Sequence, residues 1–247
     1  MKIPKAHPRY LSLTTRETVA QGVKNGITSI TGLIVHGRGE AFDYLIKEKT
    51  TESAKKSIDA AACLLINAKH PVISVNGNTA ALVPKKLVKL SKIIPAKLEI
   101  NIFHPSKKRE LKIKKHLVKN GAKEVLLPQK KSIIKHISSN RKYVNQEGIK
   151  KADVVFVPLE DGDRTEALVK NKKKVIVVDL NPFTRSSKKA TITIVDNIIR
   201  AIPLLIKQIR QLKKSNKNKL KKILKNHNNK KNLKKAIKEI NNNLVKS

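Results

Sequence analysis

VVFVPLEDGDRTEAL, residues 154–168, contains the pattern that decides the fold of this chain. Together with Asp153, its first part forms the apolar run DVVFVPL, which is typical of a strand covered on both faces. Its last part begins the segment DRTEALVKN (163–171), in which the apolar residues have helical spacing. A strand that passes through a short loop into a helix is the building unit of α/β proteins.

The same unit recurs along the chain. Short β-branched runs that end in turn residues predict further strands at 71–77, 96–103, 123–128, 174–182 and 191–196. Helical spacing predicts helices between them at 52–68, 84–94 and 108–121. Because most of the runs are continuous rather than alternating, we expect an α/β doubly wound fold, with a mostly parallel sheet and helices on both faces.

Helical segments flank this predicted sheet. Residues 9–48 are mostly helical in pattern, and residues 197–214 predict a long helix after the last strand. We therefore expect one α/β domain over residues 1–212, with a helical N-terminal portion at 1–50. Residues 213–247 contain 13 lysines and one acid, and their apolar spacing predicts a helical or partly disordered tail.

The chain is strongly basic, with 55 Lys and Arg residues against 18 Asp and Glu and a formal charge of +37. The excess is mostly lysine spread along the chain, whereas nucleic-acid readers use arginine forks and aromatic side chains, and aromatics make up only 3% here. We therefore expect phosphorylated small molecules as ligands and do not expect nucleic acid as a partner. A basic nucleotide- or RNA-binding protein without catalysis is the alternative.

The cysteine content and hydropathy point to a cytoplasmic protein without a membrane partner. Cys63 is the only cysteine and lies in the apolar run AAACLLI, so a buried structural thiol is the plain interpretation. No stretch approaches the roughly 18 apolar residues of a membrane span. The first ten residues, MKIPKAHPRY, lack the apolar core of a signal peptide.

Four acids follow the run 153–159 directly, although the chain is poor in acids: Glu160, Asp161, Asp163 and Glu166. In open α/β sheets, ligands bind beyond the carboxyl ends of the strands, and the first turn of a helix attracts phosphate. Carboxylates at this place suit Mg²⁺ bound together with substrate phosphates, and Arg164 could contact phosphate oxygens. The alternative is structural, with Asp163 as an N-cap and Glu166 completing a capping box.

Two other predicted strand ends carry polar residues. Asp179 and Asn181 follow the run KVIVV, where an acid and an amide suit a ribose and a base, although both are also ordinary turn residues. Residues Asn76-Gly77-Asn78 follow the run PVISV, and the glycine would allow close approach to a ligand.

The stretch HGRGEAFDYL (36–45) adds one further candidate site. Gly-Arg-Gly before a helix could present Arg38 and free N–H groups to an anion, but the stretch is neither a Walker loop nor GxGxxG. His36 alone is more often a packed structural histidine, and Arg16 by itself would be a solvated helix residue.

Whole phrases of the sequence resemble one family. IPKAHPRY, GLIVHGRGEAFDYLI, PVISVNGNTAALVP, VPLEDGDRTEALV, VVDLNPFTRSS and ITIVDNIIRA are similar, in order and spacing, to the archaeal phosphopantothenate synthetases (4-phosphopantoate–β-alanine ligases). The likeness covers roughly residues 3–205. Residues 104–150 and the tail resemble the family only loosely, and no functional residue is assigned in them.

The resemblance implies a homodimeric, Rossmann-like enzyme of coenzyme A biosynthesis. Such an enzyme would join 4-phosphopantoate to β-alanine with ATP and Mg²⁺, and would release AMP and pyrophosphate. The ATP-binding positions that it implies are Arg16, Arg38, Glu160, Asp161, Gly162, Asp163, Arg164, Thr165, Asp179, Leu180 and Asn181. Four further positions match family phrases without an assigned ligand: Asp196, Asn197 and the two asparagines Asn76 and Asn78 around Gly77.

The expected chemistry is an acyl-adenylate route, because a carboxylate needs an activated oxygen before an amine can replace it. It depends on positioning and charge neutralisation, not on a covalent enzyme nucleophile. We expect Arg16, Arg38 and Asp163 to act in catalysis, with the two arginines neutralising phosphates. Asp161 and Asp163 are the expected metal ligands, and Asp179 and Asn181 the nucleoside contacts. If the sheet performs the chemistry, deletion of the residues after about 213 should spare ligation.

Overall fold

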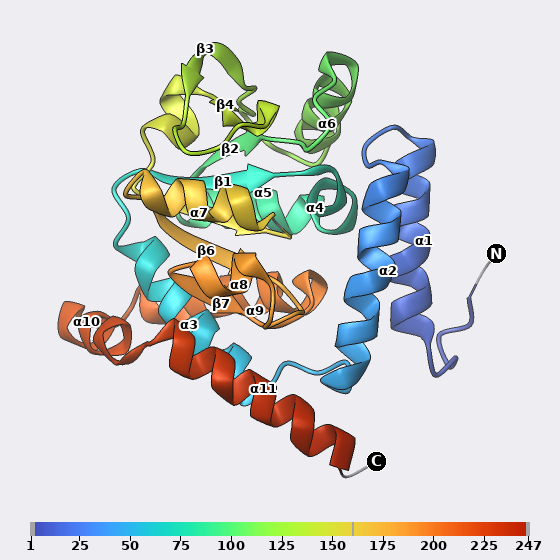
Figure 1. Ribbon diagram of the computed structural model, residues 1–247, viewed down its shortest axis with the longest axis vertical. Coiled ribbons are helices and arrows are strands. Elements are labelled where there is room, and N and C mark those ends of the chain that lie inside the picture. Colours follow the sequence, from blue (N-terminus) through green and yellow to red (C-terminus); the bar gives the residue numbers. More distant parts are fainter. Residues whose placement is uncertain (1–2, 160, 246–247) are drawn as a thin grey trace.

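The computed structural model describes residues 3–159 and 161–245. Five parallel strands form the central sheet in the order β2-β1-β5-β6-β7 (Figure 1). They are β1 (Pro71–Val75), β2 (Lys97–Ile100), β5 (Val154–Pro158), β6 (Lys174–Val178) and β7 (Ile192–Ile194). The predicted α/β fold with a parallel sheet and helices around it is confirmed.

The strand order creates a switch point between β1 and β5. From β1 the chain first adds β2 on one side, and later adds β5, β6 and β7 in turn on the other. Val72 of β1 is in register with Val155 of β5, so these neighbouring strands end side by side. Loops that leave two neighbouring strands in opposite directions open a crevice at the carboxyl edge of the sheet.

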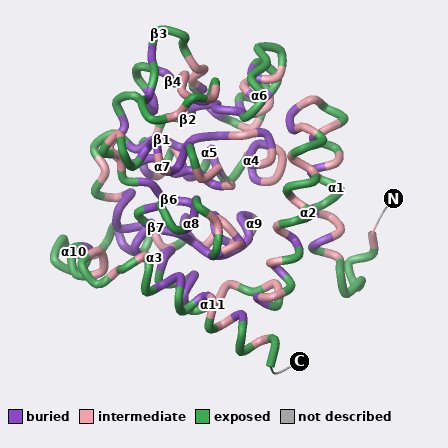
Figure 2. The backbone as a smooth tube through the Cα atoms, in the orientation of Figure 1, coloured by how far each residue is buried: buried purple, intermediate pink, exposed green. Residues whose placement is uncertain are grey.

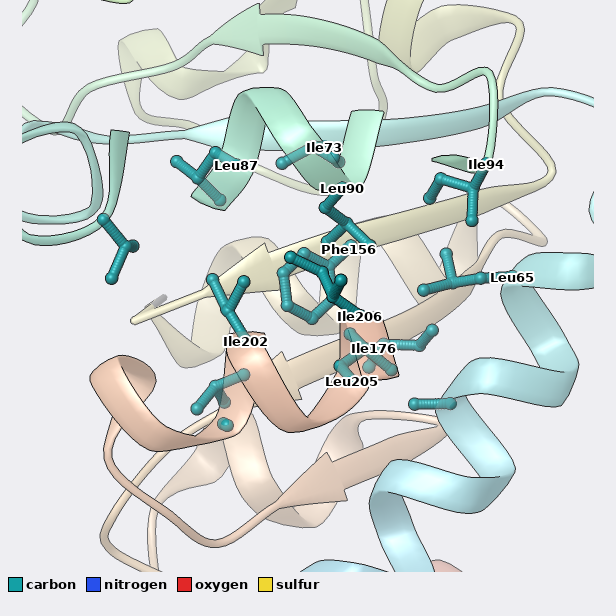
Figure 3. Close-up of a cluster of buried hydrophobic side chains, with 14 of the residues drawn as sticks. Leu65, Ile73, Leu87, Leu90, Ile94, Phe156, Ile176, Ile202, Leu205 and Ile206 are labelled. Atoms are coloured by element: carbon teal, nitrogen blue, oxygen red, sulfur yellow. The ribbon is translucent and has the colours of Figure 1, made fainter. Parts of the chain in front are cut away.

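Helices cover both faces of the sheet because alternate strand residues are apolar on each side. Ile73, Phe156 and Ile176 point into the larger core cluster (Figure 3). Val155 and Val177 point into the smaller one, on the opposite face. The larger cluster is closed by α3 (Glu52–Ile66), α5 (Pro84–Ile93) and α9 (Ile198–Leu212), and the smaller by α7 (Gly162–Lys170) and α8 (Arg185–Lys189).

Four more helices lie at the carboxyl edge of the sheet or beside its outer strand β2. Helices α1 (Tyr10–Lys24) and α2 (Ile30–Leu45) form an antiparallel hairpin beside the strand ends (Figure 1). Ser29 caps α2 by accepting the N–H of Gly32 at 3.1 Å. The short α4 (Gly77–Leu82), which contacts this hairpin, follows β1, and α6 (Lys107–Lys119) follows β2.

The basic tail forms α10 (Lys217–Asn226) and α11 (Asn229–Val245), which pack on the body. Leu220, Leu233 and Ile240 are buried, whereas most of the tail lysines are exposed (Figure 2). The side-chain amide of Asn232 donates to the carbonyl oxygen of Ser53 at 2.9 Å. The tail lysines are therefore the solvent faces of two amphipathic helices.

The segment between α6 and β5 differs from the prediction. Residues 123–128 make only an isolated bridge, between Leu126 and Glu99, instead of the expected strand. Pro128 follows and has no N–H with which to extend the pairing. The antiparallel pair of β3 (Gln129–Ile133) and β4 (Tyr143–Val144) was not predicted, because the lysines of QKKSI break its apolar pattern.

A buried carboxylate fixes the end of this segment. Glu99 of β2 is fully buried and accepts the N–H groups of Asn145 at 2.9 Å and Ile149 at 2.6 Å. Burial raises the pKa of Glu99 to about 7, although these two hydrogen bonds oppose the rise. The turns η1 (Asn140–Lys142) and η2 (Gln146–Lys150) lie around this anchor.

None of the helices within residues 3–159 and 161–245 has the length and apolarity that a membrane span requires.

Candidate active site

A cleft of about 590 Å³ lies at the carboxyl edge of the sheet, where the switch point predicts a ligand site. One wall is α2, and the other is built from the residues that follow β1, β2, β5 and β6, with the beginnings of α8 and α9. Among the residues predicted from the sequence, ten line it: Arg38, Asn76, Gly77, Asn78, Asp161, Gly162, Asp179, Leu180, Asn181 and Asn197. Asp161 after β5 and Asp179 after β6 therefore share one cleft.

The loop after β5 presents Asp161 to the cleft. Asp161 occupies the N-cap position of α7, but its carboxylate makes no cap hydrogen bond. Its Oδ2 atom instead accepts a hydrogen bond from Nη1 of Arg141 at 2.6 Å. Glu160 lies outside the described residues.

The capping-box alternative for Asp163 and Glu166 is wrong. The N-cap of α7 is Asp161, not Asp163. Asp163 lies in the first turn of α7 and is exposed. Glu166 forms ion pairs with three cations, the shortest at 2.5 Å to Arg185. Hydrogen bonding to Arg185 lowers the pKa of Glu166 to about 2. Asp163 does not line the cleft.

Two other predicted residues of α7 lie outside the cleft. Arg164 and Thr165 are fully buried, and neither lines the cleft. Thr165 donates to the carbonyl oxygen of Asp161 at 3.0 Å, which closes the first turn. At Gly162, a Cβ atom would lie 2.4 Å from Cβ of Arg185, so only glycine permits α7 and α8 to approach so closely.

The turn after β6 uses its polar side chains internally and still presents them to the cleft. Asp179 accepts hydrogen bonds from the N–H of Asn181 at 3.0 Å and the hydroxyl of Thr184 at 2.6 Å. Asn181 accepts the N–H of Phe183 at 2.8 Å. Burial raises the pKa of Asp179, although the bond from Thr184 and the charge of Arg38 oppose the rise. The turn-chemistry alternative is confirmed, and it is compatible with a binding role.

The loop after β1 joins the central strand ends. The side-chain amide of Asn76 donates to the carbonyl oxygens of Pro158 at 3.1 Å and Leu159 at 2.8 Å. A Cβ atom at Gly77 would lie 2.7 Å from the carbonyl oxygen of Ile27. The close approach that this glycine permits is therefore to the chain's own backbone.

Arg38 extends from α2 along the cleft wall. Gly37, Arg38 and Gly39 lie within α2 rather than before a helix, so their N–H groups take part in helical hydrogen bonds. Within residues 3–159 and 161–245, the exposed Arg38 guanidinium has no hydrogen-bond or ion-pair partner. His36 also lines the cleft, and burial lowers its pKa.

Arg16 does not line the cleft but holds a residue that does. Its Nη2 atom donates to Oε1 of Glu40 at 2.7 Å. Burial alone would raise the pKa of Glu40, but hydrogen bonds from Arg16 and Tyr44 outweigh it and lower the pKa. Arg16 thus fixes the α2 wall of the cleft from α1.

The residues after β7 have structural partners. Asp196 is fully buried and pairs with Arg200 at 2.7 Å, and Arg200 also pairs with Asp43 of α2. Asn197 caps α9 and donates to Asp43 at 2.7 Å. This network ties α2 to the sheet, and only Asn197 of the predicted pair Asp196-Asn197 reaches the cleft.

Several cleft residues were missed by sequence reasoning. Arg109 and Arg141 come from segments without a family-like phrase, so no signal was available for them. Arg185 and Ser186 lie in the quoted phrase VVDLNPFTRSS, and their position directly after the polar turn could have pointed to them. Phe103 ends the predicted strand at 96–103 and His104 follows it, but this strand end was not considered.

The arrangement suits a phosphorylated ligand more than a metal cluster. Within the described part of the chain, no three His, Cys, Asp or Glu side chains gather as metal ligands would. Asp161 lies in the cleft beside the cation Arg141, and one such carboxylate fits Mg²⁺ that arrives with substrate phosphates.

Fold and cleft together define a doubly wound α/β protein with a cleft at the switch point of its sheet. Residues 53–243 match the sequence model of the phosphopantothenate/pantothenate synthetase family. The chain belongs to this family, and the resemblance found in the sequence is confirmed. The match includes residues 104–150 and most of the tail, which the phrases had left aside.

Curated relatives agree along nearly the whole chain. A 4-phosphopantoate–β-alanine ligase of Methanosarcina mazei is 51% identical over 242 residues, which is 98% of this chain and 95% of the relative. The ligase of the same name from Thermococcus kodakarensis is 50% identical over 225 residues, covering 91% of this chain and 86% of the relative. A third, from Thermococcus onnurineus, is 48% identical over 249 residues.

Proposed function

We propose that this protein joins 4-phosphopantoate to β-alanine at the expense of ATP, in coenzyme A biosynthesis. The names of the relatives state this ligase activity. The observation that carries it here is the shared cleft, in which Asp161, Asp179 and Asn181 from neighbouring strand ends face Arg38 on α2. Such a cleft offers carboxylates, amides and a cation to one nucleotide.

The proposed reaction has two steps. A carboxylate oxygen of 4-phosphopantoate attacks the α-phosphorus of ATP, so that pyrophosphate leaves and an acyl-adenylate forms. The amine of β-alanine then attacks the carbonyl carbon, and AMP leaves with the former carboxylate oxygen. The ammonium nitrogen of β-alanine loses two protons, one before the amine attacks and one as the amide forms.

The roles follow from where each group lies. Arg38 neutralises phosphate charge that grows as pyrophosphate leaves, and Asp179 and Asn181 contact the nucleoside. Asp161 is the carboxylate that would hold Mg²⁺ together with the triphosphate, and the ion would supply further charge neutralisation. Asp163 is not assigned to the metal, because it lies outside the cleft. Arg16 acts as a positioning residue through Glu40.

Product analysis tests the proposal. Purified protein, ATP, MgCl₂, 4-phosphopantoate and β-alanine should give AMP, pyrophosphate and 4′-phosphopantothenate in equal amounts. If the carboxylate of 4-phosphopantoate carries ¹⁸O, one labelled oxygen should appear in AMP. Formation of ADP and labelled phosphate would instead refute the acyl-adenylate, and no turnover at all would refute the function.

Arg38 gives a matched test of the site. Arg38→Ala should slow single-turnover ligation by roughly 100-fold or more, the loss typical of removing one transition-state charge contact. Arg210→Ala removes the same charge from an exposed position of α9 outside the cleft and should not change the rate. Near-wild-type turnover of Arg38→Ala would remove this arginine from the site.

We also propose that two copies pair through α2. Ile30 and Ile34 are 70% and 68% exposed, and they lie in one row of this helix with Gly37, Ala41 and Tyr44. No atom lies within 4 Å of a Cβ placed at Gly37, so a second helix can approach there. The uncovered apolar row fits an identical row on a second copy.

Light scattering tests the dimer. The wild-type protein should have twice the mass of its chain, and Ile34→Glu should reduce it to the monomer mass. Leu111→Glu, at a half-exposed leucine of α6, is the control and should stay dimeric. A monomeric wild-type protein would contradict the pairing.

We place the reaction in the cytoplasm, where ATP is available.

A further inference from the structure

The cleft has two ends that lie at different strands. Asp179 and Asn181 follow β6, whereas Ile102 and Phe103 follow β2, with Arg109 from the first turn of α6 beside them. In the sheet order β2-β1-β5-β6-β7, three inter-strand spacings separate these ends, or about 14 Å. One cleft can therefore hold two ligands side by side along the strand ends.

The arginines of the cleft differ in their partners. Arg141 is paired with Asp161, and Arg185 is paired with Glu166. The guanidinium groups of Arg38 and Arg109 have no hydrogen-bond or ion-pair partner within residues 3–159 and 161–245. These two cations come from opposite walls of the cleft, one from α2 and one from α6.

Arg109 is held in place and partly desolvated. Its backbone N–H donates to the hydroxyl of Ser106, which caps α6, and Ile113 and Leu117 of the same helix are fully buried. The Nε atom of Arg109 is buried without a hydrogen-bond acceptor. Burial lowers the pKa of Arg109, although the charge of Glu110 opposes this. A dianion beside this guanidinium would supply the missing acceptors.

The proposed reaction needs two phosphate-bearing ligands at once. We infer that Arg109 binds the phosphate of the acid substrate, 4-phosphopantoate, at the β2 end of the cleft, while Arg38 serves ATP; this assignment rests on the proposed function. The apolar side chains of Ile102 and Phe103 at the same end suit the two methyl groups of pantoate. The carboxylate then points toward the middle of the cleft, where the α-phosphate is attacked.

Substitution of Arg109 tests this assignment against a neighbour. Arg109→Gln should raise the KM for 4-phosphopantoate by about 10- to 100-fold, the loss of a charge-assisted contact, and should change the KM for ATP less than about threefold. The preference for 4-phosphopantoate over pantoate should fall by the same factor. Lys108→Gln removes an adjacent charge that does not line the cleft, and should change neither constant.

The outcomes separate this inference from the proposed function. If the wild-type protein forms no AMP from 4-phosphopantoate and β-alanine, the proposed function fails. If the wild-type protein is active but Arg109→Gln has an unchanged KM for 4-phosphopantoate, or raises the KM for ATP equally, this assignment alone is overturned.

A conservative variant provides a second test of the assignment of Arg109. Arg109→Lys keeps the charge, so thermal unfolding should match the wild-type protein even if Arg109→Gln is poorly folded. It should raise the KM for 4-phosphopantoate several-fold, because a lysine cannot reproduce the arginine fork. Equal effects on both substrates, or none on 4-phosphopantoate, would again overturn the assignment.

Discussion

Nη1 of Arg141 lies 2.6 Å from Oδ2 of Asp161. The pair joins two segments that are 20 residues apart: Arg141 belongs to the turn η1, beyond the edge strand β2, and Asp161 to the loop after the central strand β5. Arg141 is only 4% exposed, and Asn101 accepts hydrogen bonds from its Nε atom at 2.8 Å and its Nη2 atom at 3.1 Å. The orientation of Asp161 thus depends on a segment in which no functional residue was predicted.

A double-mutant cycle measures this coupling. Arg141→Gln, Asp161→Asn and the double variant, compared by urea unfolding, should give a coupling energy of about 1–2 kcal/mol, because one partner is buried and the other half exposed. The pair of Arg185 and Glu166 is the control, and should give a smaller value because Arg185 is 61% exposed. Additive effects of Arg141→Gln and Asp161→Asn would contradict the link.

Glu99 should make stability depend on pH. Its pKa of about 7 in the folded protein lies above its ordinary value of 4.5, so the unfolded chain loses this proton first as the pH rises. The free energy of unfolding should therefore fall by about 2–3 kcal/mol between pH 5 and pH 8 because of this group. Urea titrations at both pH values should show a smaller fall for Glu99→Gln. Glu124→Gln, at an exposed position, should keep the wild-type dependence; an equal fall in all three proteins would contradict the assignment.

Alanine substitutions at two glycines should change the free energy of unfolding in opposite directions. Gly77→Ala should lower the free energy of unfolding by about 1–3 kcal/mol, since its Cβ atom would meet the backbone of residues 27–28. Gly39→Ala, inside α2, where the nearest atom to the new methyl group is Cδ1 of Leu180 at 3.7 Å, should raise it by about 0.5–1 kcal/mol. Thermal unfolding of the three proteins measures both signs. A loss of similar size in both variants would refute this account of Gly77.

The basic tail should contribute stability rather than binding. Leu233→Ala should cost about 2–4 kcal/mol in urea unfolding, because this buried side chain packs with Val195 and Ala236. Replacing the exposed Lys230, Lys231 and Lys234 with Gln should leave both stability and ligation unchanged.

The packing of the tail changes the expectation for its deletion. Removal of the residues after 213 uncovers α3 and takes Ile240 away from Leu180 in the cleft wall. Ligation should therefore fall because of lost stability, contrary to the expectation from sequence. A truncated protein with wild-type stability would restore the original interpretation, and loss of ligation in the lysine variants would favour the RNA-binding alternative.

Most of the fold could be predicted because its signals are local. Apolar β-branched runs such as 154–158 and 174–178 can be buried only between two helical layers, so their positions fix the sheet. The short pair β3–β4 could not be predicted, because its lysine-rich strand is exposed and lacks an apolar pattern. Gly77 gave a partial signal, because it marked a close approach but not the surface that approaches.

The candidate site also has one part that could be predicted from the sequence and one part that could not. The sequence by itself determined the polar turns after β5 and β6, since a strand end followed by Asp, Asn and Gly is written in consecutive residues. Only the tertiary structure decided which cations meet them: Arg164, adjacent in sequence, is buried away from the cleft, whereas Arg109 and Arg141 arrive from the far edge of the sheet. The physical reason is that the residue type alone gives a side chain its charge. Its burial and its partner depend instead on contacts with other segments of the folded chain.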